Sequence, residues 1–197
     1  MEVTTVKKLI LVALAAMVTV ACANQQVPAE MALKGLESAV SAAQPEIEKF
    51  AGAQMAGITD AVAAARKKFA AGDFAGVIAD VPAVTSTVTA AVTAAATAKT
   101  ALVSEWGTFA TLPAMVGQAT SKMTELGAMK RLPAGMDKAK LDGAKASLES
   151  VNTLWTAASA AFAQGDLMAA VGKAKEVKPM IDALMTTLGL AGMAAKM

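Results

Sequence analysis

Apolar residues recur every three or four positions along two long stretches of the chain, which is the spacing of one face of a helix. Each stretch is followed by a Gly-Asp pair, Gly72-Asp73 in the first and Gly165-Asp166 in the second. Gly suits the left-handed residue just after a helix end, and Asp caps the helix that follows. The pattern therefore predicts, in each half of the chain, two long helices joined by a tight corner. The stripes are Ile47, Phe50, Gln54, Ile58, Val62, Ala65 and Phe69, then Leu141, Ala144, Leu148, Val151, Trp155, Ala158 and Phe162.

The two halves match at a constant offset of 93 residues. Residues 69–74 (FAAGDF) align with residues 162–167 (FAQGDL), and the agreement extends to both sides of the corner. Such agreement at one offset indicates an internal duplication. Long helices joined by a short corner lie antiparallel and form a bundle. We therefore predict an all-α fold, an antiparallel helical bundle built from a duplicated three-helix unit. The further matched pairs are Ile58 with Val151, Val88 with Ile181, Leu33 with Leu126 and Leu36 with Met129.

Start and stop signals give the expected helix boundaries. Pro45 suits the first turn of a helix, where its missing N–H costs nothing. Pro82 and Pro179 lie inside predicted helices, and each is expected either to kink its helix or to divide it. The first helical unit then covers residues 30–100, a connector covers 101–113, and the second unit covers 114–197. The expected helices are 29–43, 45–71 and 73–100, followed by 114–131, 137–164 and 166–190.

Composition agrees with the helical pattern. Apolar residues make up 55% of the 197 residues, chiefly because Ala is abundant, whereas aromatic residues make up only 4%. Residues 81–98 carry no charge, so a membrane span and a bundle helix are both conceivable there. An apolar stripe and a separate hydroxyl stripe favour the bundle helix, because a span needs no such two-sided pattern. The stripes are Val84, Val88, Val92 and Ala95, against Thr85, Thr89 and Thr93.

The amino terminus has the layout of an export signal. Lys7 and Lys8 precede twelve uncharged, apolar residues at 9–20. Twelve helical residues rise about 18 Å, which is too short to cross a hydrocarbon core of about 30 Å. A signal peptide fits this segment better than a membrane anchor.

The end of this segment, Thr19-Val20-Ala21-Cys22, resembles the lipobox of bacterial lipoproteins. Ala21 matches that pattern, whereas Thr19 departs from it because the family prefers an aliphatic residue there. The resemblance implies a signal peptide at residues 1–21 and a mature chain that begins at a lipidated Cys22. Ala23, in place of Asp, favours the periplasmic face of the outer membrane. Residues 22–29 are expected to form a tether.

A second interpretation of the same residues remains open. Ala21-Cys22-Ala23 also fits ordinary secretory cleavage after Ala23, which would release a soluble periplasmic or secreted protein. Cys22 would then be an incidental small residue. Its position as the sole Cys of the chain, directly after the apolar segment, favours lipidation.

The chain lacks the side chains that many reactions need. It has no His and a single Cys, so His-dependent nucleophilic triads, His-metal sites and structural zinc sites are excluded. The 13 Met residues are more typical of core packing than of copper binding without His or Cys partners. A net charge of +2 provides no basic surface for nucleic acid. We predict no enzymatic activity, no cofactor, no metal and no nucleic-acid partner.

Basic clusters have an ordinary explanation in the sequence. Arg66-Lys67-Lys68 and Lys130-Arg131 both fall at predicted helix ends, where cations complement the helix dipole. Residues 138–145 contain three further lysines, which suit an acidic partner or lipid headgroups. Asp142 nearby favours an ordinary mixed, solvated face instead.

These observations predict a lipid-anchored protein of the cell envelope that acts by interaction or as a structural component. It would bind the membrane through a lipid on Cys22 and an unidentified envelope protein through its helices. The alternative is a periplasmic binding module for an apolar or lipidic small molecule. Trp106 and Phe109 are the candidate contact residues, because they lie in the connector and have no counterpart in the repeat. The ordinary alternative is that they cap the end of the bundle, and it is the favoured one, because an exposed apolar pair needs a reason for its exposure.

Overall fold

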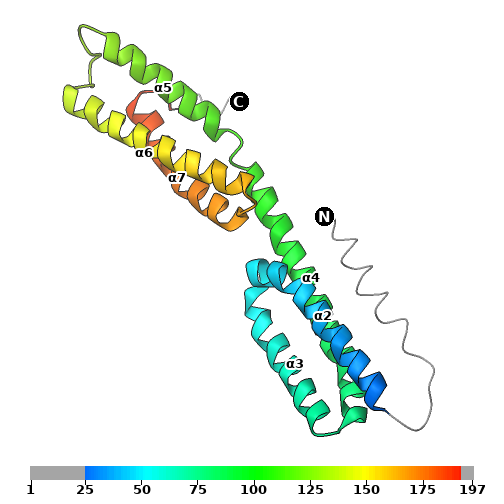
Figure 1. Cartoon of the computed structure of the whole chain (residues 1–197). Helices are drawn as coiled ribbons and strands as arrows, with labels where there is room; N and C mark the ends of the chain where they lie inside the picture. Colours follow the sequence, from blue (N-terminus) through cyan, green and yellow to red (C-terminus); the bar gives the residue numbers. More distant parts are fainter. Residues whose placement is uncertain (1–24, 192–197) are drawn as a thin grey trace. The chain divides into compact units, whose positions relative to one another are not determined.

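The computed structural model describes residues 25–191, and all regular structure in this range is helical (Figure 1). This confirms the predicted all-α fold. The chain divides into two compact units, the first ending at Lys99 and the second beginning at Thr100. One helix, α4, contributes residues to both units. The elements are α2 (Gln26–Ala51), the 3-10 turn η1 (Gly52–Gln54), α3 (Met55–Ala70), α4 (Phe74–Gly107), α5 (Leu112–Ala128), α6 (Lys138–Ala163) and α7 (Leu167–Thr187).

The first unit packs α2, α3 and the larger part of α4 around small and β-branched side chains. Ile47 and Ile58 are fully buried and lie in one cluster with Val88. A second cluster, nearer the corner, contains Leu36 and Val77. Ala residues are numerous at these contacts, and short side chains let helix backbones approach closely. Further buried members are Ala29, Ala32, Leu33, Val62, Ala65, Val81 and Val84 in the second cluster, and Ala43, Ala91 and Val92 in the first.

The second unit packs the end of α4 with α5, α6 and α7 around one continuous core with larger side chains. Helices α6 and α7 lie side by side in Figure 1. Val151, Val177 and Ile181 are fully buried between the helices. Phe109 and Leu112, at the turn between α4 and α5, close one part of this core. Other buried members are Met115, Val116, Leu126, Leu148, Leu184 and Met185.

Both predicted corners have the expected backbone and cap. Gly72 and Gly165 adopt φ of 79° and 74°, a left-handed conformation in which a Cβ atom is strained. The carboxylate of Asp73 accepts a hydrogen bond from Gly76 N at 2.9 Å, and that of Asp166 accepts one from Ala169 N at 3.4 Å. Sequence therefore located both helix–helix corners and their caps correctly.

The predicted break at Pro45 is wrong. Pro45 lies inside α2, which continues to Ala51, and the chain turns instead at Gly52–Gln54. A proline inside a helix leaves the carbonyl four residues earlier without its partner. That residue is Ser41, which is exposed, as is Pro45 itself, so water can satisfy the carbonyl. Ala51, at φ −143° and ψ 35°, makes the turn.

Two other boundaries differ from expectation, and neither Pro82 nor Pro179 divides its helix. Helix α2 begins at Gln26, so the predicted tether at 22–29 is already helical over its last four residues. Pro28 is tolerated there because first-turn N–H groups have no helical partner. The predicted connector at 101–113 consists of the end of α4, a turn at 108–111 and the start of α5. Helices α4 and α7 run without a break through Pro82 and Pro179.

One helical stretch of the described residues, starting at Phe74, is long and apolar enough to cross a membrane by length and composition alone. A third of its most apolar window (33%) is buried inside the protein. The predicted apolar stripe of α4, Val84, Val88, Val92 and Ala95, is buried. This stripe packs on the first unit, as the bundle interpretation requires.

Candidate functional site

Cys22, the predicted lipidation site, lies outside the described residues. The structure does place the predicted contact residues, Trp106 and Phe109, at one end of the core of the second unit. They belong to an aromatic cluster with Trp155 and Phe162 of α6. We define these four residues as the aromatic cluster.

Trp106 is the centre of this cluster. Its ring is stacked on Trp155, with ring centroids 5.4 Å apart and an interplanar angle of 4°. It is also stacked on Phe162, at 4.6 Å and 10°. Phe109 meets Trp106 edge to face at 6.5 Å. Offset-stacked and edge-to-face pairs contribute about 0.5–1.5 kcal/mol each beyond their buried area. The cluster therefore fixes the last turns of α4 against α6.

The two predicted contact residues, Trp106 and Phe109, differ in how deeply they are buried. Phe109 is only 5% exposed and lies within the core, whereas Trp106 is partly buried. The ring of Phe109 therefore packs against the core and is not accessible to a partner in this conformation. Trp106 keeps some accessible surface, but both faces of its ring already touch other aromatic rings. This arrangement favours the alternative in which the two residues cap the bundle end.

Sequence reasoning assigned Trp155 and Phe162 to the core stripe and did not connect them with Trp106. A signal was available, because residues seven apart lie on one face of a helix, two turns from each other. Two aromatic rings at that spacing leave room for a third ring between them. Only the fold shows that the third ring comes from the end of α4.

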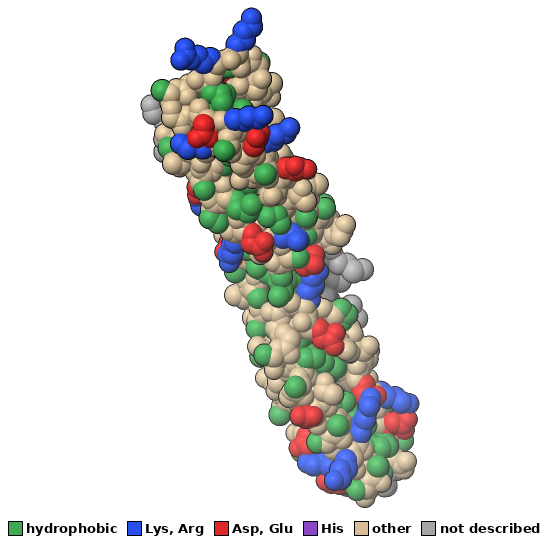
Figure 2. Space-filling model, turned by 90° about the vertical axis from the view of Figure 1, so that its left-hand side faces the viewer, with side chains coloured by type: hydrophobic (Ala, Val, Ile, Leu, Met, Phe, Trp, Pro, Cys, Tyr) green, Lys and Arg blue, Asp and Glu red, His purple; other side chains and the backbone are tan. Residues whose placement is uncertain are grey.

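Charged side chains are mostly mixed in sign over the surface (Figure 2). Lys68 contacts Asp80 at 2.6 Å, and Arg66 contacts Glu37 at 2.6 Å. The hydrogen bond to Asp80 raises the pKa of Lys68 above its ordinary value. The hydrogen bond to Glu30 likewise raises the pKa of Lys34. These contacts lie on exposed surface, where ion pairs contribute little.

The explanation predicted for the basic clusters holds for one and fails for the other. Lys67 and Lys68 lie in the last turn of α3, where they complement the helix dipole. Lys130 and Arg131 do not lie in α5, which ends at Ala128 with no basic residue in its last turn. The early end of α5 places them in the loop that leads to α6.

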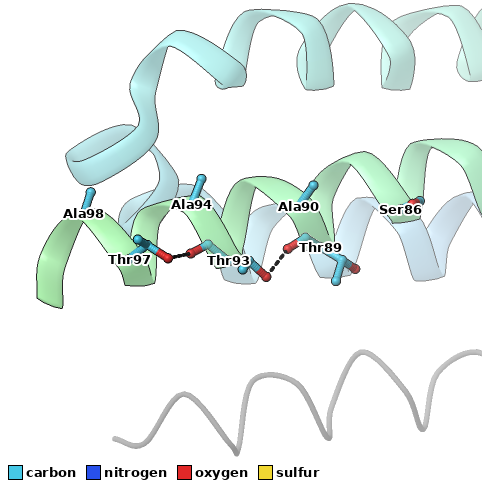
Figure 3. A pocket seen from close by; sticks show the side chains of 7 residues that line it. All are labelled: Ser86, Thr89, Ala90, Thr93, Ala94, Thr97 and Ala98. Atoms are coloured by element: carbon cyan, nitrogen blue, oxygen red, sulfur yellow. Dashed lines mark hydrogen bonds between the residues drawn. The ribbon is translucent and has the colours of Figure 1, made fainter. Parts of the chain in front are cut away.

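A shallow, open surface on α4 is lined by residues of that helix alone (Figure 3). It carries no charge, and the hydroxyl groups of Thr93 and Thr97 donate to the carbonyls of Thr89 and Thr93, one turn earlier. These bonds satisfy the hydroxyls within the helix, so they do not reach toward a ligand. The lining residues are Ser86, Thr89, Ala90, Thr93, Ala94, Thr97 and Ala98.

In residues 25–191 no group of three His, Cys, Asp or Glu side chains is placed to hold a metal ion. Comparison of the chain with protein-family models, with curated proteins and with solved structures finds no match.

Proposed function

We propose that this chain is a lipid-anchored protein of the cell envelope that acts through recognition and not through catalysis. Cys22 carries this proposal. It is the sole Cys of the chain and directly follows the apolar residues 9–20 and a small residue, Ala21. A diacylated Cys22 would attach the mature chain to a membrane, since the thiol is the group that lipid transfer needs.

The position at which the first helix begins supports a close attachment of the folded chain to the membrane. Helix α2 begins at Gln26, so three residues, 23–25, separate Cys22 from the helix. Fully extended chain spans at most about 3.6 Å per residue. A lipid on Cys22 would hold the first turn of α2 within roughly 15 Å of the membrane surface.

Recognition is favoured over catalysis by the chemistry available. The whole chain has no His, and its one Cys would be consumed by the lipid. Nucleophilic triads and His-metal chemistry are therefore excluded. What the folded units offer is helix faces, and binding energy on such faces concentrates in a few large side chains. Trp106 is partly buried, whereas Phe109 is buried, so Trp106 remains our candidate for such a contact.

We propose further that the two units arose by duplication of an antiparallel helical unit. Support comes from the corners, where Gly, Asp and the preceding Phe recur at the same offset, and where both Gly residues adopt a left-handed conformation. Duplication would provide two similar scaffolds, of which one is free to diverge.

The test is the intact mass of the mature protein purified from its host. A mass that begins at diacylated Cys22 is expected, and Cys22→Ser should yield an unlipidated protein that no longer partitions into detergent. A mature chain that begins at Asn24 without lipid would overturn the proposal. A protein that co-purifies in stoichiometric amount supports recognition of an envelope partner. A co-purified lipidic molecule in its place favours the ligand-binding alternative.

A further inference from the structure

The loop between α5 and α6 and the first turns of α6 form a basic segment, residues 129–145. It contains five basic residues, Lys130, Arg131, Lys138, Lys140 and Lys145, and two acidic ones, Asp137 and Asp142, for a net charge of +3. Figure 2 shows basic side chains projecting, without acidic ones beside them, at the end where Figure 1 places this loop. The protein as a whole is close to neutral, so this concentration of charge is local.

The cations of the basic segment are largely unpaired. Lys130, Arg131, Lys138 and Lys145 are exposed, and none of them makes an ion pair with another residue of the described chain. Lys140 donates to the carbonyl of Gly135 at 2.8 Å, which folds the loop.

Asp137, one of the two acidic residues of the segment, forms a helix cap and no ion pair with the basic side chains of the described chain. The Asp137 carboxylate accepts a hydrogen bond from the backbone N–H of Lys140 at 2.7 Å and so caps α6. Acidic side chains therefore leave most of this positive charge unneutralised.

The helix-dipole explanation does not account for Lys130 and Arg131, because both lie beyond the end of α5. The contrast with the first unit is direct. There the basic cluster at the end of α3 uses Arg66 and Lys68 in ion pairs with Glu37 and Asp80. The two basic clusters resemble each other in sequence, but only the cluster at the end of α3 forms ion pairs with acidic residues of other helices.

An apolar residue lies directly beside the free cations. Met129, at the end of α5, is 38% exposed. Leu132 and Met136 of the same loop are partly buried against the core of the second unit. An exposed apolar side chain flanked by cations is the composition of a segment that contacts an anionic lipid surface. A soluble polyanion would need the cations alone.

We infer that the basic segment is a docking surface for a membrane with anionic headgroups. Lys130 and Arg131 meet phosphate groups, and the Met129 side chain enters the interface between headgroups and acyl chains. This contact is independent of the lipid on Cys22, because it uses only residues of the second unit. It gives the proposed recognition function a partner of definite chemistry.

The experiment measures contact at the loop itself. The full chain with Cys22→Ser has no other thiol, so Met129→Cys provides one position for an environment-sensitive fluorophore. We expect lipids with quenchers on their acyl chains to quench this label in vesicles of phosphatidylglycerol and phosphatidylcholine. Phosphatidylcholine alone should give no quenching. Each cation near an anionic surface contributes about 1 kcal/mol, so Lys130→Glu with Arg131→Glu should weaken the apparent affinity about 30-fold or more.

Two controls make the result specific. A label at Met168→Cys, which is 55% exposed at the start of α7, should stay unquenched. The double variant Lys67→Glu with Lys173→Glu changes the net charge equally, and it should leave the quenching at position 129 intact.

Several results would overturn the inference. One is vesicle attachment without quenching at position 129, and another is equal loss of quenching in the two double variants. Tight binding to soluble heparin with no quenching by lipid would assign the cations to a polyanion instead. Every protein in the series carries Cys22→Ser, so the result does not depend on whether lipidation occurs.

Discussion

The two units of this protein bury the same positions of their last long helix. With the exception of Thr85, every buried residue of α4 has a buried counterpart 93 residues later, in α7 or at its carboxyl cap. The side chains differ in size at six of the seven pairs: four residues of the first unit match larger ones in the second, and two match smaller ones. The positions of the core are thus kept while its volume changes. The pairs are Val77 with Ala170, Val81 with Ala174, Val84 with Val177, Val88 with Ile181, Ala91 with Leu184, Val92 with Met185 and Ala95 with Leu188.

The units differ most in the segments that precede residue 45 of the first unit and residue 138 of the second. Residues 36–44 of the first unit continue α2, whereas the matching residues 129–137 form a loop before α6. The predicted pair Leu36 and Met129 separates accordingly, with exposed fractions of 2% and 38%. Net charge differs as well. Residues 36–52 carry three acidic residues and one basic residue, or −2, against +3 for residues 129–145. The corner and the last long helix are alike in the two units, and the segment 129–145 is where the second unit presents a different surface.

A smaller difference at the corners has a visible cause. A Cβ atom on Gly76 would lie 2.2 Å from an Asp73 carboxylate oxygen. The matching residue in the second unit is Ala169, which has that Cβ, and its cap bond from Asp166 is the longer one, 3.4 Å against 2.9 Å. Glycine at this position lets the carboxylate approach the backbone.

Removing a matched core side chain should have the largest effect. Ile58→Ala and Ile181→Ala each remove a fully buried side chain and should cost about 2–5 kcal/mol of unfolding free energy. Both Trp residues lie in the second unit, so Trp fluorescence reports that unit, whereas far-UV circular dichroism reports both. Ile181→Ala should lower the midpoint of the fluorescence transition, and Ile58→Ala should mainly broaden the dichroism transition. Equal shifts of both probes in both variants would mean that the two units unfold as one.

The aromatic cluster should have the next largest effect. Trp106→Ala removes two stacked contacts and one edge-to-face contact, and we expect a loss of about 2–4 kcal/mol. Phe69→Ala removes one edge-to-face contact with Phe74 from a partly buried site and should cost less, about 1–3 kcal/mol. Thermal melts followed by circular dichroism compare the two. An unchanged melting temperature for Trp106→Ala would show that its ring is available for a partner.

The caps should show a smaller difference. Asp73→Ala removes the shorter cap bond and should cost about 1 kcal/mol, whereas Asp166→Ala should cost less than that. Urea denaturation of the two variants measures the difference. Gly76→Ala is the matched control, because it should bring the Asp73→Ala cost down to that of Asp166→Ala. Equal costs for the two Asp variants in the natural background would contradict this account of the glycine.

The exposed ion pair of Lys68 and Asp80 should have the smallest effect. The folded-state pKa of Lys68 is raised above the ordinary 10.5, so its contribution is complete below that pH and is lost as pH rises through the folded value. Asp80→Asn should be slightly less stable than the parent at neutral pH, and this difference should vanish in strongly alkaline solution. Lys67→Met serves as the control. A difference that persists at high pH would assign the effect to Asp80 alone.

Sequence by itself determined the helical fold, the two corners and most of the buried stripe. These features are local, because a period of 3.6, a left-handed Gly and a capping Asp act within a few residues of one another. Val84, Val88, Ile58 and Val151 were all placed correctly in the core on that basis.

The tertiary structure decided the features that depend on solvent exposure and on distant partners. Pro45 could stay inside a helix because Ser41, four residues earlier, is exposed to water. Trp155 and Phe162 belong to one aromatic cluster because the ring of Trp106, from α4, is stacked on both of them. Arg66 and Lys68 found acidic partners on α2 and α4, whereas Lys130 and Arg131 were left free by the early end of α5. Local periodicity carries no information on which charges and rings meet across the fold, since such contacts depend on how the helices pack.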